Sequence, residues 1–351
     1  MGATIVVGGQ FGSEGKGKVV ALITMVSPAP WVVRCGGPNS GHTIDLAGRR
    51  TVLRQVPAGV GNPEALLLLS AGCVIDEDVL LTEIKELNLA PDRIIVDPRA
   101  ALVLPEDLEA EKCLTQAIAS TGSGTGAALI GRMSRAQGRP LAKDSLHLRN
   151  AATVRPVAPM VHDHISAGGD VIVEGTQGFG LSLLHGPGYP YVTSRDTTAS
   201  AFASEVGLAP RDISEVIMVI RTFPIRVGGP SGHLPKEITW ETVRELSRAP
   251  KAIPEFTSVT RKLRRVAHFD PHLVSLAARY NRPTSIAIMG LDRLDFSNTR
   301  ATAASSLSPC SLRFIRQAED LAKAPARWLG TGFETSEAIT IDGMGQSHAG
   351  D

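Results

Sequence analysis

Residues 11–19, FGSEGKGKV, come close to a phosphate-binding loop. They fit the spacing G-x-x-x-x-G-K, but Val19 stands where the common form places a serine or threonine hydroxyl on magnesium. An apolar run at 4–9 precedes the loop. A strand, a glycine loop and a helix start form the context in which backbone N–H groups converge on phosphate oxygens, and Lys16 or Lys18 would add positive charge. The alternative interpretation is a tight turn that carries two solvated lysines.

A second segment, RCGGPNSGHT at 34–43, carries polar side chains between glycines. The glycines free the backbone around Asn39 and His42, so that an amide and an imidazole can be presented in a cleft. An imidazole so placed can act as a general acid toward a phosphate or carbonyl oxygen. A structural histidine in a loop is the competing interpretation.

Three further segments combine small or hydroxyl side chains with groups that bind anions or bases. STGSGTG at 120–126 leads to several arginines and suits either a nucleotide monophosphate or a flexible surface loop. In EGTQGFG at 174–180, Gln177 could hold a base edge, or it could be a buried structural glutamine. TSVTRKLRR at 257–265 indicates an anion loop for a carboxylate or a solvated charged face. The arginines after the first segment are Arg132, Arg135 and Arg139.

The composition excludes some classes of partner. With 36 Lys and Arg against 35 Asp and Glu, the net charge is +1, so no overall field favours nucleic acid or a membrane surface. No apolar run approaches the ~20 residues of a membrane helix, and the N-terminus shows no signal-peptide pattern. The four cysteines are scattered, as in reduced cytosolic proteins. We expect a cytoplasmic protein.

Short β-branched runs predict a mostly parallel central sheet, because strands buried on both faces are continuously apolar. These runs lie at 4–9, 171–175, 215–221 and 284–290. Helices are expected at 76–88, where Asp76 would be the N-cap, and at 106–118.

Other segments have weaker signals. Residues 51–56 and 66–70 could form a peripheral hairpin or added strands. Stretches rich in proline and glycine predict long functional loops at 121–140, 185–190 and 228–235. We expect one α/β domain over 1–351, with a glycine loop after the first strand and long insertions.

The ordered motifs resemble those of the adenylosuccinate synthetase family. Its members carry G-Q-W-G-D-E-G-K-G-K, N-A-G-H-T, T-T-G-R-G, E-G-A-Q-G, Y-P-Y-V-T-S-S-N-T-T and an arginine-rich aspartate loop. The corresponding segments here are GQFGSEGKGK, NSGHT, STGSG, EGTQG, YPYVTSRDTT and VTRKLRR. The family's reaction moves a γ-phosphoryl group to the 6-oxygen of a purine monophosphate, after which the amine of aspartate displaces the phosphate.

The resemblance implies a role for each matching residue. The residues expected to take part in catalysis are Ser13, Lys16, His42 and Gln177. The residues expected to bind the triphosphate are Gly12, Glu14, Gly15, Lys16, Gly17, Lys18, Gly41, His42, Thr43, Asp292 and Gly332. The residues expected to bind the purine monophosphate are Ser13, Asn39, Thr121, Arg135, Gln177, Thr193 and Val227. The residues expected to bind aspartate are Val259, Thr260, Arg264 and Arg265. Mg²⁺ would lie on the Gly41 carbonyl and weakly on Ser13, and Arg135 would reach the neighbouring site of a homodimer.

Ser13 departs from the family, which has an aspartate that takes the N1 proton of inosine monophosphate and helps to hold magnesium. A serine hydroxyl is a poor base near neutral pH and a weak metal ligand. Its small size leaves room for the 2-amino group of guanine, from which the hydroxyl can accept a hydrogen bond. The chain therefore looks like the phage branch of the family, 2-aminoadenylosuccinate synthetase, which uses dGMP, aspartate and ATP or dATP to make a diaminopurine precursor.

Three other departures concern the remaining ligands. The family's T-K-L-D segment is MGLD at 289–292, which keeps Asp292 and loses the lysine. Its S-T-G-P-x-R signature is GTGFET, with Thr335 in place of the arginine. These two changes argue against strict use of GTP. Leu263 stands at the first arginine of the aspartate loop, which would fit a deoxynucleotide substrate.

Three functions remain open at this point. The first is a ligase that acts on dGMP, and the second is an ordinary adenylosuccinate synthetase that uses IMP and GTP. The third is a nucleotide-binding paralogue that has lost catalysis. Retention of His42, Gln177 and Lys16 argues against the third.

Overall fold

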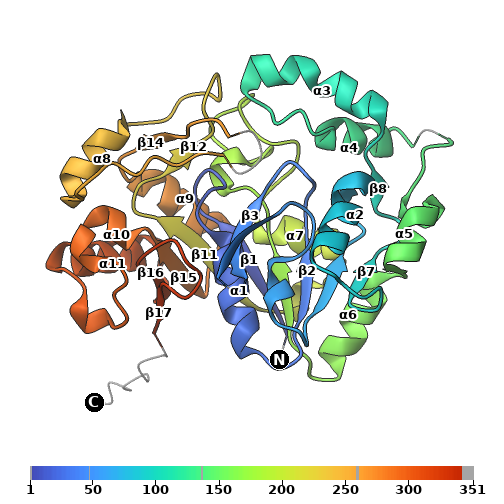
Figure 1. Cartoon of the computed structure of the whole chain (residues 1–351), viewed down its shortest axis with the longest axis horizontal. Coiled ribbons are helices and arrows are strands. Elements are labelled where there is room, and N and C mark those ends of the chain that lie inside the picture. Colours follow the sequence, from blue (N-terminus) through green and yellow to red (C-terminus); the bar gives the residue numbers. More distant parts are fainter. Residues whose placement is uncertain (1, 47, 136, 258–260, 342–351) are drawn as a thin grey trace.

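A central sheet of ten strands runs through the described part of the chain, nine of them parallel and β17 antiparallel at one edge. The computed structural model describes residues 2–46, 48–135, 137–257 and 261–341 (Figure 1). The strand order is β17-β16-β15-β11-β1-β10-β2-β5-β7-β9, so the first strand lies inside the sheet. The bounds are β1 Ala3–Gly8, β2 Trp31–Arg34, β5 Leu66–Leu69, β7 Ile94–Val96, β9 Thr153–Val154, β10 Val171–Glu174, β11 Ile213–Arg221, β15 Ser285–Met289, β16 Ala326–Gly330 and β17 Ala338–Thr340.

Helices cover both faces of the sheet. One hydrophobic core packs α6, α7, α9 and α11 against one face, and a second packs α1, α2 and α5 against the other. The bounds are α1 Lys16–Val26, α2 Glu77–Glu86, α3 Pro105–Ile118, α4 Thr125–Met133, α5 Leu146–Ala151, α6 Val157–Ser166, α7 Ala199–Val206, α8 Trp240–Ser247, α9 Pro271–Asn281, α10 Leu291–Leu294 and α11 Pro309–Ala322. Within these described residues, no helix is long and apolar enough to cross a membrane.

Smaller sheets stand beside the central one. The β3–β4 hairpin directly follows the segment that holds Asn39, and a three-stranded sheet orders β12, β14 and β13. Their bounds are β3 His42–Leu46, β4 Arg49–Leu53, β6 Val74–Ile75, β8 Ala101–Leu102, β12 Ile225–Arg226, β13 Glu237–Ile238 and β14 Arg265–Ala267.

The burial of β1 explains its sequence. Ile5 and Val7 pack into the first core and Val6 into the second, and all three side chains are fully buried. A strand covered on both faces needs apolar side chains at successive positions. The four predicted strands are confirmed as β1, β10, β11 and β15, and the two predicted helices as α2 and α3. The Asp76 side chain accepts from Val79 N at 3.2 Å, which confirms the N-cap.

Of the two alternatives for 51–56 and 66–70, the structure confirms added strands and excludes a hairpin between the two segments. Residues 66–69 form β5 between β2 and β7, and 49–53 pair with 42–46. Periodicity could not distinguish an inner strand from an edge strand in so short an apolar run. The stretch 121–140 is not a continuous loop, because Thr125–Met133 is helical. Gly122 and Gly124 precede the helix, and Gly124 is the N-cap, with φ 70°.

Glu83 on α2 gives a test of the packing that holds the segment after β4. Its carboxylate, almost fully buried, accepts from the backbone N–H groups of Arg54, Gln55 and Val56. Glu83→Ala should lower the free energy of unfolding by about 3 kcal/mol, because buried donors lose their acceptor. Urea unfolding measures this change. The control is Glu86→Ala, on the exposed side of the same helix, and equal stability of the two variants would contradict the prediction.

Candidate active site

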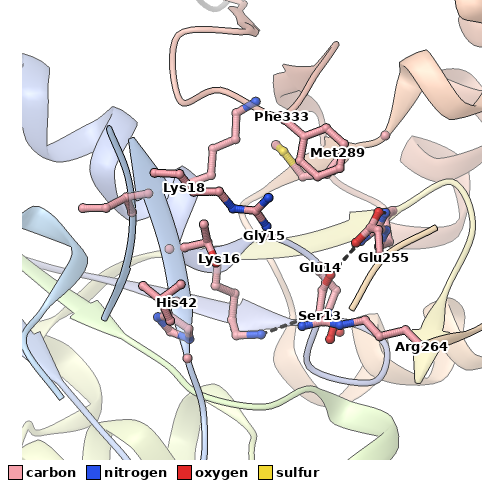
Figure 2. A pocket seen from close by; sticks show the side chains of 18 of the residues that line it. Ser13, Glu14, Gly15, Lys16, Lys18, His42, Glu255, Arg264, Met289 and Phe333 are labelled. Carbon is pink, nitrogen blue, oxygen red and sulfur yellow. Dashed lines mark hydrogen bonds and ion pairs between the residues drawn. The ribbon is translucent and has the colours of Figure 1, made fainter. Parts of the chain in front are cut away.

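A cavity of about 410 Å³ lies at the carboxyl ends of β1, β11 and β15. The glycine loop after β1 forms one wall, and the β3–β4 hairpin, the segment before β14 and the loop after β16 form the others (Figure 2). Sites at this edge are typical of open parallel sheets. The lining side chains include seven cations: Lys16, Lys18, Arg50, Arg221, Arg261, Arg264 and Arg293.

The glycine loop is shaped by the Glu14 carboxylate. Glu14 accepts from Gln10 N at 3.0 Å and Gly12 N at 2.7 Å, and it forms an ion pair with Lys16 Nζ at 2.7 Å. Both charged side chains are 1% exposed. The next helix starts after Gly15, which has φ 105° and lacks a side-chain cap. The N–H groups of the first turn therefore remain free to bind an anion.

Lys18 ties the first helix to the loop after β16. Its Nζ donates to the carbonyls of Gly332 at 3.0 Å and Glu337 at 2.8 Å. Burial lowers the pKa of Lys18 to about 8, although the nearby Asp292 carboxylate opposes this shift. Lys18 is thus a structural connection between two walls of the cavity.

His42 belongs to a buried network with Arg34 and Glu174. Arg34 Nη1 donates to Glu174 Oε1 at 2.7 Å, and His42 Nδ1 contacts the same oxygen. Burial and the Arg34 charge lower the pKa of His42 to about 4, although Glu174 raises it. His42 Nε2 is buried without a hydrogen-bond partner among the described residues. The lowered pKa favours the uncharged imidazole in the free protein at neutral pH.

Ser13 lies on the cavity wall beside an arginine–glutamate pair. Its backbone carbonyl accepts from Arg221 Nη1 at 3.0 Å, and Arg221 Nη2 forms an ion pair with Glu255 at 2.5 Å. Burial alone would raise the pKa of Glu255, but Arg221, with help from Arg264, holds it at about 2. The Ser13 hydroxyl has no hydrogen-bond partner within the described residues. It is thus free to contact a ligand.

Gln177 follows β10 and lies against the glycine loop. It adopts φ 59°, and a Cβ at Gly12 would lie 3.2 Å from its side-chain oxygen. A Cβ at Gly8 would lie 2.6 Å from its backbone carbonyl and 2.8 Å from Lys16 Nζ. The two glycines therefore permit a close approach that larger residues would prevent.

The structure places all of the expected triphosphate residues on the cavity wall. They are Gly12, Glu14, Gly15, Lys16, Gly17, Lys18, Gly41, His42, Thr43, Asp292 and Gly332, together with Ser13 and Arg264 from the other two sets. The Glu14 carboxylate is nevertheless engaged inside the loop. Outside the lining lie Asn39, Thr121, Arg135, Gln177, Thr193, Val227 and Arg265. Val259 and Thr260 fall outside the described residues.

Arg265 differs from the expectation that it holds the carboxylates of aspartate. Its guanidinium binds Glu237 at 2.5 and 2.8 Å and donates to the Ser231 hydroxyl and the Gly232 carbonyl. Arg264, one residue earlier, lines the cavity instead. Successive side chains on an extended backbone point to opposite sides, and the sequence alone did not show which arginine faces inward.

Several lining residues were not predicted. Arg221 was visible as the polar end of a predicted strand, and Glu255 precedes the arginine-rich segment, but nothing in the sequence indicated their pairing. Arg50 and Phe333 come from the β3–β4 hairpin and the loop after β16, and the Arg50 Cζ lies 5.6 Å from the ring centroid of Phe333. A phenylalanine inside the G-T-G-F-E-T segment was the available signal for this part of the site.

The donor set for a metal ion is small. No group of three or more His, Cys, Asp or Glu side chains suited to a metal occurs among the described residues. The Gly41 carbonyl and the Ser13 hydroxyl are neutral oxygen donors on the cavity wall. They fit Mg²⁺ that is held chiefly by the phosphates of a nucleotide, since this ion commonly takes few protein ligands beside phosphate oxygens.

Two solved structures resemble this fold. The first is the succinoaminodeoxyadenylate synthetase of cyanophage S-2L, bound to dGMP and to dATP as an energy donor; it has a TM-score of 0.79 and 28% identity, and covers 97% of this chain and 95% of that chain. The second is the fully ligated adenylosuccinate synthetase of Plasmodium falciparum, with a TM-score of 0.81 and 20% identity. This match covers 97% of this chain and 100% of the Plasmodium chain. At that identity the second likeness shows the fold alone.

Sequence comparison gives the family directly. The family model for adenylosuccinate synthetase matches residues 5–142 and 141–304. Adenylosuccinate synthetase of Archaeoglobus fulgidus is 39% identical over 345 residues, which cover 97% of this chain and 98% of the relative. The enzyme of Methanocaldococcus jannaschii is 38% identical and covers 96% of each. This chain therefore belongs to the adenylosuccinate synthetase family and is a C–N bond-forming ligase.

Proposed function

We propose that this enzyme condenses dGMP with L-aspartate, with ATP or dATP as the phosphoryl donor. The product would be 2-amino-2′-deoxyadenylosuccinate, a precursor of diaminopurine for DNA synthesis. The observation that carries this proposal is Ser13, a small neutral residue with a free hydroxyl on the cavity wall. The neighbouring carboxylate of Glu14 cannot take the place of the family's aspartate, because it is bound to Lys16 and two backbone N–H groups.

The cyanophage enzyme supports this substrate set, since its structure holds dGMP and dATP and covers 97% of this chain. A second candidate is the ordinary reaction with IMP and GTP. Sequence identity favours this candidate, because an archaeal adenylosuccinate synthetase is 39% identical to this chain, whereas the cyanophage enzyme is 28% identical. Ser13 favours the first candidate, because its small side chain leaves room for a 2-amino group and its hydroxyl can accept a hydrogen bond from that group, which IMP lacks.

In the proposed reaction the γ-phosphoryl group passes to the 6-oxygen of dGMP, the base gives up its N1 proton to water, and ADP or dADP leaves. The glycine loop and Lys16 bind the phosphates, and Mg²⁺ would neutralise their charge beside the Gly41 carbonyl. The aspartate amine then attacks C6, and inorganic phosphate departs with the former 6-oxygen. Arg264 is positioned at the cavity wall to bind an aspartate carboxylate.

His42 gains its proton only when the nucleotides bind. In the free protein its pKa is about 4, but anionic phosphates beside an imidazole raise its pKa. Nε2, which lacks a partner among the described residues, then carries the proton toward the 6-oxygen. Glu174, at Nδ1, holds the ring in position.

The enzyme is proposed to act in the cytoplasm as a homodimer. Arg135 is exposed just beyond α4 and outside the cavity lining of its own chain. Two large apolar side chains of the same helix, Ile130 and Met133, are 70% and 76% exposed. An apolar face next to an arginine suits a subunit interface through which Arg135 reaches the monophosphate of its partner.

Substitution at Ser13 tests the substrate. For the wild type, kcat/KM with dGMP should exceed that with dIMP by about 10², because the hydroxyl accepts from the 2-amino group. Ser13→Asp should reduce this ratio by crowding the amino group, and Ser13→Ala, which keeps the space but removes the acceptor, should give an intermediate ratio. Steady-state kinetics measure the three ratios. A wild-type ratio near one that neither variant changes would reject Ser13 as the selector and favour IMP.

Loss of the His42 imidazole should slow the chemical step. His42→Asn should lower kcat by ~10²–10³, since one group that stabilises developing charge is lost. The KM values for the nucleotides should change much less, and circular dichroism should show an unchanged fold. His272→Asn, on the exposed side of α9, is the control. Near-native turnover of a folded His42→Asn enzyme would exclude the proposed role.

Mixed dimers test the shared site. Arg135→Leu and Lys16→Ala subunits should each be inactive alone, yet mixing them should restore about a quarter of the native activity, because half of the dimers then hold one intact site. Arg149→Leu, an exposed arginine on α5, should remain active without mixing. An active monomer, or no recovery in dimers shown to have exchanged subunits, would disprove the shared site.

A further inference from the structure

Arg221 joins two walls of the cavity. It is the last residue of β11, and its guanidinium reaches both the glycine loop and the segment before β14. Nη1 donates to the Ser13 carbonyl at 3.0 Å and to Glu255 Oε2 at 3.2 Å, and Nη2 donates to Glu255 Oε1 at 2.5 Å. The two side chains of this ion pair are 12% and 14% exposed. A bidentate pair of this kind, shielded from water, fixes the position of both partners.

The backbone of Arg221 is held as firmly as its side chain. Gln10, which is 1% exposed, accepts from Arg221 N at 3.0 Å through its side-chain oxygen. Its side-chain nitrogen donates to the Arg221 carbonyl at 3.1 Å. Both ends of a buried amide therefore hold the end of β11 against the glycine loop. The position of the guanidinium relative to Ser13 is thus set by the sheet.

Glu255 is also a neighbour of Arg264. The backbone N–H of Arg264 donates to the Glu255 carbonyl at 2.8 Å, and Phe256 pairs with Leu263 in an antiparallel bridge. Both charged side chains line the cavity, on the same side of it as Ser13 in Figure 2. Burial lowers the pKa of Arg264, and the charge of Glu255 opposes this shift. Glu255 is therefore an alternative partner for the Arg264 guanidinium.

Arg221 prevents this alternative pairing. It binds both carboxylate oxygens of Glu255, and Arg264 Nε stays buried without a hydrogen-bond partner among the described residues. A carboxylate that is shielded from water needs a cation to compensate its charge. If the Arg221 charge were removed, Arg264 would be available across the bridge to replace it.

We propose that Arg221 is a positioning residue for aspartate, because it occupies both oxygens of Glu255 and so leaves Arg264 free for a substrate carboxylate. This inference rests on the proposed role of Arg264 and adds the residue on which that role depends. A guanidinium that is paired inside the protein must be released before it binds a ligand, and the apparent affinity falls with the fraction that is free. In this role Arg221 acts through Glu255 and needs no contact with aspartate.

Steady-state kinetics test this role through the KM for aspartate. Arg221→Gln should raise this KM about tenfold, because Glu255 then engages Arg264 in most molecules. The KM for each nucleotide should change by less than about threefold, since the glycine loop keeps its own ion pair. Arg99→Gln is the control: it breaks a bidentate pair with Asp97 outside the cavity lining and should leave all three KM values unchanged.

A second substitution separates competition for Arg264 from a loss of structure. In Arg221→Gln/Glu255→Gln the neutral amide no longer competes, so the KM for aspartate should return to within about threefold of the wild-type value. A purely structural role of Arg221 would leave the double variant as impaired as the single one. Arg221→Lys provides the test if Arg221→Gln fails to fold. Its single ammonium cannot bind both Glu255 oxygens and the Ser13 carbonyl together, so the KM should rise about threefold.

Three outcomes would overturn the inference: an unchanged KM for aspartate in both Arg221 variants, an equal rise of all three KM values, or no recovery in the double variant. Arg264→Leu separates such a failure from a failure of the proposed function. If Arg264→Leu raises the KM for aspartate and Arg221→Gln does not, only the positioning role is wrong. If Arg264→Leu leaves that KM unchanged, the proposed aspartate site is wrong, and the positioning role with it. Aspartate is a substrate of both candidate reactions, so assays with dGMP and with IMP keep these outcomes independent of the monophosphate.

Discussion

The buried Glu14 carboxylate determines the shape of the phosphate loop. It accepts from Gln10 N and Gly12 N and pairs with Lys16, so that the charge taken out of water is compensated on every side. The loop consequently turns back on itself and presents the uncapped helix start after Gly15 to the cavity. Because Glu14 is engaged inside the loop, its carboxylate is not available to a ligand. The side chain that the glycine loop presents to the cavity is therefore that of residue 13, which here carries a hydroxyl.

Neighbouring carboxylates are compensated in the same way, which leaves the cavity with free hydrogen-bond donors. Glu174 pairs with Arg34, and Glu255 pairs with Arg221. In contrast, Arg221 Nε, Arg264 Nε and one terminal nitrogen of Arg293 are buried without a partner among the described residues. Unpaired donors of this kind are costly in an empty site. Under the proposed function, phosphate and carboxylate oxygens of the bound substrates would accept from these donors.

Local patterns predicted the parts of the fold that depend on local physics. The strands β1, β10, β11 and β15 were visible as apolar runs, and the glycine loop as a turn between strand and helix. The position of β5 inside the sheet depends on pairing with strands far away in the chain, which no local signal encodes. The same limit applies to the site: Arg264 and Arg265 are identical in type, and only the start of β14 at Arg265 determines which of them faces the cavity.

Two of the departures from the family pattern have a common physical direction. At Ser13 a carboxylate is replaced by a hydroxyl, and at Gly290 the family's lysine is absent. Gly290 has φ 82°, and a Cβ there would lie 3.1 Å from the Thr222 hydroxyl, which donates to the Gly290 carbonyl at 2.6 Å. This backbone is therefore adapted to glycine. Under the proposed function, both changes remove a charged group from the site: Ser13 leaves space and a hydroxyl, and MGLD keeps the Asp292 carboxylate without the lysine. Such a site suits bases that carry amino groups, because the Ser13 hydroxyl and the Asp292 carboxylate are both oxygen acceptors.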